Sequence, residues 1–172
     1  MFILEASITS DLDREKKQKH YTPKEALVKA AAYCAYQERT QQEVRTKLYT
    51  YGLEPDDVEE LIVRLSQEKL IDEERYAQSY VRGKYGLKKW GRRKITQGLK
   101  SKGISDYCIK QGMKEIDPEV YEQNLLSLLE KKSATEKEKN PFLRRQKLTY
   151  FLVSKGYEND LVQDALKGLE SS

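Results

Sequence analysis

The strongest concentration of reactive and charged side chains lies between Arg75 and Ser105, where ten basic residues occur and no acidic one. A dense positive charge attracts phosphate backbones or acidic protein surfaces and speeds the encounter with them. A solvated helix face can carry a similar run, so the charge indicates binding but leaves this alternative open. The basic residues are Arg75, Arg82, Lys84, Lys88, Lys89, Arg92, Arg93, Lys94, Lys100 and Lys102.

Aromatic side chains are interleaved with these cations. Aromatic and cationic groups together are used by proteins that bind single strands and by the hot spots of protein interfaces. The same residues also fit the buried stripe of an amphipathic helix, and the periodicity favours that interpretation for Tyr76. Trp90, directly before Gly91, fits either interpretation. The aromatic residues are Tyr76, Tyr80, Tyr85 and Trp90.

The sequence has no residues at the spacing that a catalytic site or a metal centre would need. His20 is the single histidine, and no cysteine or carboxylate cluster has the spacing of metal ligands. The glycines of the segment 98–105 are spaced as in a phosphate-cradling loop, but Ile104 stands where the essential lysine belongs. We therefore expect no catalytic residue, no metal and no cofactor.

The composition favours long amphipathic helices. Of the 172 residues, 35% are charged and 38% hydrophobic, with 4 prolines and 9 glycines. The apolar runs are too short for a membrane span, and the N-terminus lacks the apolar stretch of a signal peptide. Cys34 and Cys108 fit as core thiols. We expect a cytoplasmic protein that does not enter the membrane, and a monomer.

The elements that must position these side chains follow a repeat of about fifty residues, because the glycines that end three similar segments are 51 and 53 residues apart. Apolar residues four apart share one helix face, and a glycine four residues further on is a typical helix stop in the left-handed conformation. A second apolar stripe follows each glycine. The segments are Val44-x3-Leu48-x3-Gly52, Ile95-x3-Leu99-x3-Gly103 and Leu148-x3-Leu152-x3-Gly156.

A third helix precedes each pair, and its start signals are clear. Thr22-Pro23, Asp117-Pro118 and Asn140-Pro141 place a capping side chain before a proline, and Thr40 to Glu43 forms a capping box. The expected helices are 23–38, 41–51, 55–69, 73–86, 92–102, 106–116, 118–135, 141–155 and 158–169.

These helices divide the chain into a flexible N-terminal arm over 1–21 and three-helix repeats over 22–70, 71–116 and 117–172. The fold class is therefore all-α, with three tandem three-helix repeats whose stacked cores form an elongated, curved body. The helix-Gly-helix pairs are also typical of a DNA-reading helix-turn-helix. In the first repeat, however, the second helix of the pair carries Asp56, Asp57, Glu59 and Glu60, which phosphates would repel.

Four short motifs follow one another along the first two repeats. They are Arg39-x3-Glu43-Val44-x2-Lys47-Leu48, Leu70-Ile-Asp72-Glu-Glu-Arg-Tyr76-Ala77, Gly91-Arg92-Arg93-Lys94-Ile95 and Leu99-x3-Gly103-Ile104. Together with the fifty-residue repeat, these motifs resemble the bacterial RecX family, regulators of the RecA recombinase. The resemblance covers about residues 23 to 169 and is strongest over 39 to 104. A mild departure is Asp72-Glu73, where the commonest family form has two acidic residues of the same kind.

The resemblance implies tandem three-helix units that bind in the groove of the RecA filament on single-stranded DNA and inhibit its ATPase, strand-exchange and co-protease activities. No catalytic residue is implied. Arg75 and Lys94 fit equally as intramolecular partners of Asp72 or of the acidic third helix. We expect the contacts with the partner to be made by Arg75, Arg82, Lys84, Lys88, Lys89, Trp90, Arg92, Arg93 and Lys94.

Two other functions fit the residues. The basic second repeat could bind DNA or RNA by itself, in which case its affinity should fall steeply with salt. The chain could also be a scaffold for another acidic protein. Neither alternative is excluded by the sequence.

Overall fold

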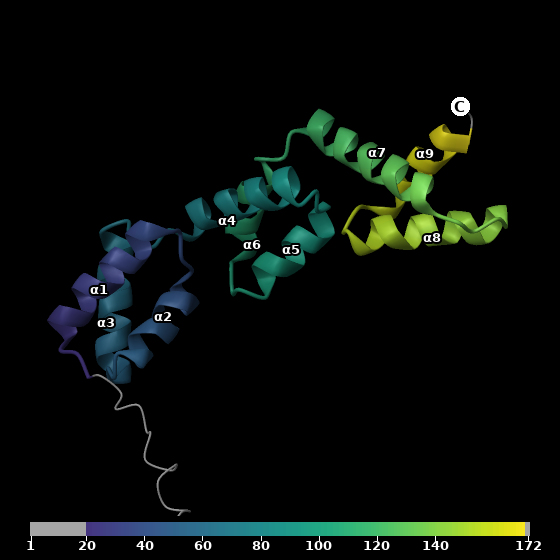
Figure 1. Ribbon diagram of the computed structural model, residues 1–172. Helices are drawn as coiled ribbons and strands as arrows, with labels where there is room; N and C mark the ends of the chain where they lie inside the picture. Colours follow the sequence, from purple (N-terminus) through teal and green to yellow (C-terminus); the bar gives the residue numbers. More distant parts are fainter. Residues whose placement is uncertain (1–19, 171–172) are drawn as a thin grey trace, which may run out of the picture.

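The chain folds into helices only, in the computed structural model that describes residues 20–170. Figure 1 shows the helices in separate groups that follow one another along an elongated, curved body. The predicted arm, apart from His20 and Tyr21, lies outside the described residues. The helices are α1 Pro23–Tyr36, α2 Gln41–Thr50, α3 Pro55–Gln67, α4 Glu73–Arg82, α5 Arg92–Lys100, α6 Asp106–Met113, α7 Pro118–Thr135, α8 Pro141–Ser154 and α9 Asn159–Glu170, with a π-helical turn, η1 Gly83–Leu87, after α4.

The predicted start and stop signals are present in the structure. Thr22 and Thr40 each complete a capping box with a glutamate three residues on. Asp72, Ser105, Asp117 and Asn140 accept hydrogen bonds from backbone N–H groups of the first turn. The three repeat glycines have φ of 79°, 76° and 97°, the left-handed conformation that ends each middle helix.

Several helices are shorter than the sequence predicts. The expected helix 73–86 stops being α-helical at Arg82, where the π-helical turn begins. The helices expected to reach 102 and 116 end at Lys100 and Met113, because their last residues form tighter turns. In those turns the N–H groups of Lys102 and Ile116 bond to carbonyls three residues back.

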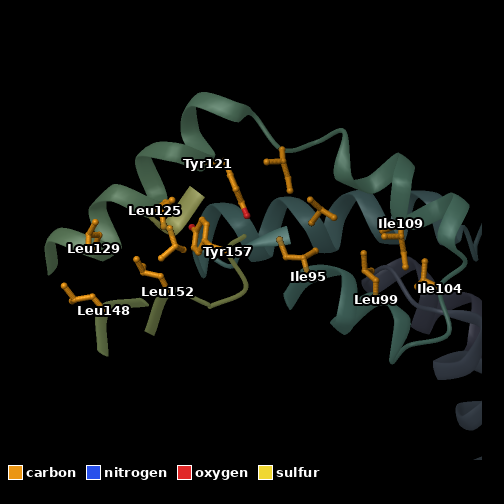
Figure 2. Close-up of a cluster of buried hydrophobic side chains, with 14 of the residues drawn as sticks. Ile95, Leu99, Ile104, Ile109, Tyr121, Leu125, Leu129, Leu148, Leu152 and Tyr157 are labelled. Carbon is orange, nitrogen blue, oxygen red and sulfur yellow. The ribbon is translucent and has the colours of Figure 1, made fainter. Parts of the chain in front are cut away.

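The hydrophobic core has two parts. One cluster runs from Ala26 to Ile71 and fills the first unit alone, whereas a second continues from Tyr76 to Leu166 through the second and third units. Figure 2 shows this second cluster, in which side chains of α5 and α6 continue into those of α7 and α8. The expected stacked core is therefore continuous across units two and three only. No helix within residues 20–170 is long and apolar enough to cross a membrane.

Candidate partner-binding surface

Most of the basic residues of the second unit lie within or next to η1 and the first turn of α5. A Cβ added at Gly83 or at Gly86 would meet no other group within 4 Å, so this segment is loosely packed. Lys89 has φ of 51°, and the Trp90 N–H donates to the Lys84 carbonyl over 3.0 Å. These features redirect the chain between α4 and α5, and π-helical turns of this kind are frequent at functional sites.

Two of the predicted contact residues belong to α4, one near its start and one at its last residue directly before η1, and both are engaged in ion pairs. The Arg75 guanidinium bonds to Glu38 of the first unit and lies 3.8 Å from Asp72. Arg82 lies 2.8 Å from Glu115, at the end of α6. Arg75 therefore links the first and second units, which agrees with the intramolecular alternative for this residue, and Arg82 joins α4 to the end of α6.

Trp90 is a half-buried ring between two ammonium groups. The Nζ atoms of Lys84 and Lys94 lie 4.9 and 4.8 Å from its centroid. Lys94 Nζ also donates to the Ser154 carbonyl at 3.3 Å. The intramolecular partners of Lys94 are thus Trp90 and α8, not Asp72 or α3. These two contacts make Trp90 a cation-binding group within the protein.

Arg92 is the centre of a polar cluster that joins the second and third units. Its backbone N–H donates to the Tyr121 hydroxyl over 2.9 Å, and its guanidinium lies 4.0 Å from the Tyr121 ring centroid. The Tyr121 hydroxyl donates to Glu158 over 2.8 Å, and Glu158 also lies 3.4 Å from the guanidinium. Burial raises the pKa of Tyr121 well above its usual value, and the bond to Glu158 adds to the shift. The phenol therefore stays protonated and can act as a donor.

Backbone contacts complete this junction. The N–H groups of Gly91 and Arg93 donate to the carbonyls of Lys155 and Gly156 over 2.9 and 3.0 Å. The Lys89 side chain donates to Ser127 on α7 over 3.0 Å. Because these segments of the two units approach so closely, the second and third units form one packed body at this point.

The side chains of Lys88 and Arg93 are exposed and make no ion pair or hydrogen bond with any other described residue. Lys88 directly follows Leu87, of which 84% is exposed. The structure therefore divides the nine predicted contact residues into seven with intramolecular partners and two with free charges. An exposed apolar side chain next to a free cation is suited to a partner with an acidic, partly apolar surface.

Two features of the second unit were not predicted from the sequence. The exposure of Leu87 depends on the π-helical turn, and the signal that pointed to it was the pair of flanking glycines at positions 83 and 86. The second is the contact of Lys102 with Glu43 of the first unit, an ion pair of 2.8 Å. Burial alone would raise the pKa of Glu43, but its hydrogen bonds, first that from Lys102, leave it below its usual value. No sequence pattern pairs residues so far apart.

Over residues 20–170 no three or more His, Cys, Asp or Glu side chains are grouped so as to hold a metal ion. The arrangement of charged groups instead supports intramolecular junctions and one free basic surface.

Three family models match the chain in order. They describe the first, second and third three-helix domains of RecX and match residues 26–65, 72–113 and 119–166. The regulatory protein RecX of Bacillus mycoides is 33% identical over 167 residues, which cover 96% of this chain and 59% of that protein. RecX of Clostridium perfringens is 32% identical over 136 residues, or 78% and 63% of the two chains. The chain thus spans about 60% of the length of these relatives.

Solved structures agree with these matches. A crystal structure of RecX from Lactobacillus salivarius has a TM-score of 0.78 and 25% identity, and the match covers 87% of this chain and 97% of that one. A second crystal structure of a regulatory protein RecX has the same TM-score and 27% identity, with 84% and 73% covered. The order of the three domains and the fold lead to one conclusion: this chain belongs to the RecX family of regulatory proteins.

Proposed function

We propose that this protein is a non-enzymatic regulator that binds the RecA recombinase, or its filament on single-stranded DNA, and thereby modulates recombination and DNA repair. Bound there, it inhibits the ATPase, strand-exchange and co-protease activities. It acts in the cytoplasm and as a monomer. The observation that carries this proposal is the free basic surface of Lys88 and Arg93 in the middle unit of a curved body of the RecX family.

The shape of the chain supports inhibition without catalysis. An elongated body that contacts neighbouring subunits of a helical filament binds one arrangement of those subunits better than others. A ligand of this kind shifts the population towards the arrangement that it prefers. If hydrolysis of ATP requires the subunits to rearrange, the bound regulator lowers the rate of hydrolysis.

The seven engaged residues contribute to this surface mainly by holding it in place. Arg92 joins two units through Tyr121 and Glu158, so its replacement would alter the packing as well as the charge. Lys88 and Arg93 carry charges that can be removed without breaking an intramolecular bond of their side chains. They are the residues on which a test of direct contact should rest.

The test is the DNA-dependent ATPase of a RecA recombinase, titrated with the wild-type protein and with the double variant Lys88→Ala and Arg93→Ala. Exposed ion pairs contribute about 0.2–1 kcal/mol each, so the half-inhibitory concentration should rise about 2- to 30-fold. The matched control is Lys24→Ala with Lys110→Ala, which removes two exposed, unpaired charges from other surfaces. The control should inhibit like the wild type.

An arm with excess single-stranded DNA separates this function from autonomous nucleic-acid binding. Inhibition that persists in excess DNA supports the regulator. Full recovery of the ATPase on adding DNA, or equal losses in the double variant and its control, would contradict it. The contacts of the Trp90 ring with two lysines also argue against base stacking at that position, because stacking would compete with them.

A further inference from the structure

A groove between α7 and α9 lies on the third unit and reaches Arg92 and Tyr121, so it borders the junction with the second unit. Its volume is about 640 Å³. The buried side chains of Leu125 and Leu129 form its base, and three partly exposed leucines line it, each 38% or 39% exposed. These are Leu126, Leu161 and Leu169. Three large apolar side chains that gather in one hollow are a feature of binding sites on protein surfaces.

The groove exists because the third unit lacks the close helix contact of the second. In the second unit Gly112 of α6 faces Ala77 of α4, where an added Cβ would lie 3.0 Å from the Ala77 backbone. The position that corresponds to Gly112 in the repeat is Ala165 of α9, nine residues after the turn glycine in both units. Ala165 instead lines the hollow together with leucines of α7.

The charge around the groove identifies the kind of partner. Its lining holds three carboxylates, of Glu122, Glu130 and Asp164, and one guanidinium. The guanidinium belongs to Arg92 and is paired with Glu158, and Asp164 is paired with Lys167. The exposed side chains of Glu122 and Glu130 have no ion-pair partner among the described residues, so they supply the net charge of the rim. A negative rim repels phosphate groups and attracts lysine and arginine. This surface has the opposite sign to the basic surface of the second unit.

The shape of the groove indicates a helix. Its α7 side runs from Pro118 to Glu130 and its α9 side from Leu161 to Leu169, so the walls are about 18 and 12 Å long at 1.5 Å per residue. The ridges of a third helix fit between two helices, and the described residues offer no sheet edge to which a strand could add. We propose that this groove binds an amphipathic, basic helix of a partner protein, about two to three turns long.

The probe for this proposal is a fluorescein-labelled synthetic helix of about 14 residues, long enough to span the groove. It carries leucines on one face and lysines on the other, and a matched probe has glutamate in place of lysine. Anisotropy titrations with the full chain should show binding of the lysine probe at least about 10-fold tighter than that of the glutamate probe. Equal affinities would overturn the proposal.

Two pairs of variants locate the binding. Glu122→Gln with Glu130→Gln should weaken binding of the lysine probe about 2- to 30-fold, because two exposed ion pairs are lost. The control, Glu54→Gln with Glu60→Gln, removes the same charge from exposed side chains of the first unit and should leave the affinity unchanged. Equal effects of the two pairs would mean that only net charge matters, and the groove assignment would be wrong.

Methyl NMR provides a second, independent readout. The lysine probe should shift the methyl signals of Leu126, Leu161 and Leu169, and shifts confined to leucines elsewhere would refute the site. Sedimentation of the chain alone tests whether a second copy of the chain occupies the groove instead. A concentration-dependent dimer that is lost in Leu161→Ser would assign the groove to a second copy and overturn the proposal of a basic partner.

Discussion

The replacement Gly91→Ala tests whether the second and third units form one body. A Cβ at this position would lie 2.1 Å from the Gly156 carbonyl carbon and 2.3 Å from the Tyr157 nitrogen. Both are backbone atoms, so neither can rotate away as a side chain would. The two backbone segments must therefore separate. The hydrogen bonds from the N–H groups of Gly91 and Arg93 to the third unit are then lengthened or lost.

The cost follows from these contacts. Forcing an extra methyl group into a packed site costs about 1–3 kcal/mol, and each hydrogen bond contributes about 0.5–1.5 kcal/mol. Gly91→Ala should therefore lower the free energy of unfolding by about 2–6 kcal/mol. Each kcal/mol corresponds to about 2–4 °C in melting temperature for a chain of this size. The single tryptophan, Trp90, lies next to the junction, so its fluorescence in a denaturant titration reports on it directly.

The matched control is Gly86→Ala, because a Cβ there would meet nothing within 4 Å. This change should leave the stability unchanged or raise it by about 0.4–1 kcal/mol through the entropy of the unfolded chain. If Gly91→Ala altered the free energy of unfolding no more than Gly86→Ala, the close backbone contact between the units would be refuted.

Three further predictions concern the junctions. Tyr121→Phe should cost about 1–3 kcal/mol in denaturant titrations, because Glu158 and a backbone N–H lose a buried partner; a wild-type midpoint would contradict this. Burial raises the pKa of Tyr157 to about 12, so the folded form keeps a proton that the unfolded form loses above pH 10. Stability should be unaffected by this group below pH 10 and fall by about 1.4 kcal/mol per pH unit up to pH 12, more steeply than in Tyr157→Phe. Lys102→Ala should cost less than about 1 kcal/mol because its ion pair with Glu43 is partly exposed, and added salt should reduce the difference.

Much of the fold could be predicted from local patterns. Capping residues such as Thr22 and Asn140 satisfy backbone N–H groups within a few residues of themselves, so their effect can be read without a structure. The turn glycines at 52, 103 and 156 act equally locally, because only glycine takes a positive φ at little cost. The end of α4 at Arg82 could not be predicted in the same way, since the apolar periodicity continues through the π-helical turn.

The sequence predicted the region of the candidate site. It did not predict which of the charged side chains are paired within the protein and which are free. The run of cations from Arg75 to Lys102 identified the second unit as the basic one. The same run contains Arg92, which ties two units together, and Arg93, which is free. Adjacent residues of one helix point about 100° apart, so equal charges in sequence can have opposite roles in the folded chain.

The sequence by itself therefore determined most of each helix, the repeat of three units and the positive charge of the second unit, because these depend on residues close together in the chain. Only the tertiary structure decided which cations are paired. It also decided that units two and three share a core and that a groove opens between α7 and α9. These properties depend on contacts between residues such as Gly91 and Gly156, which are far apart in sequence and meet only when the units pack.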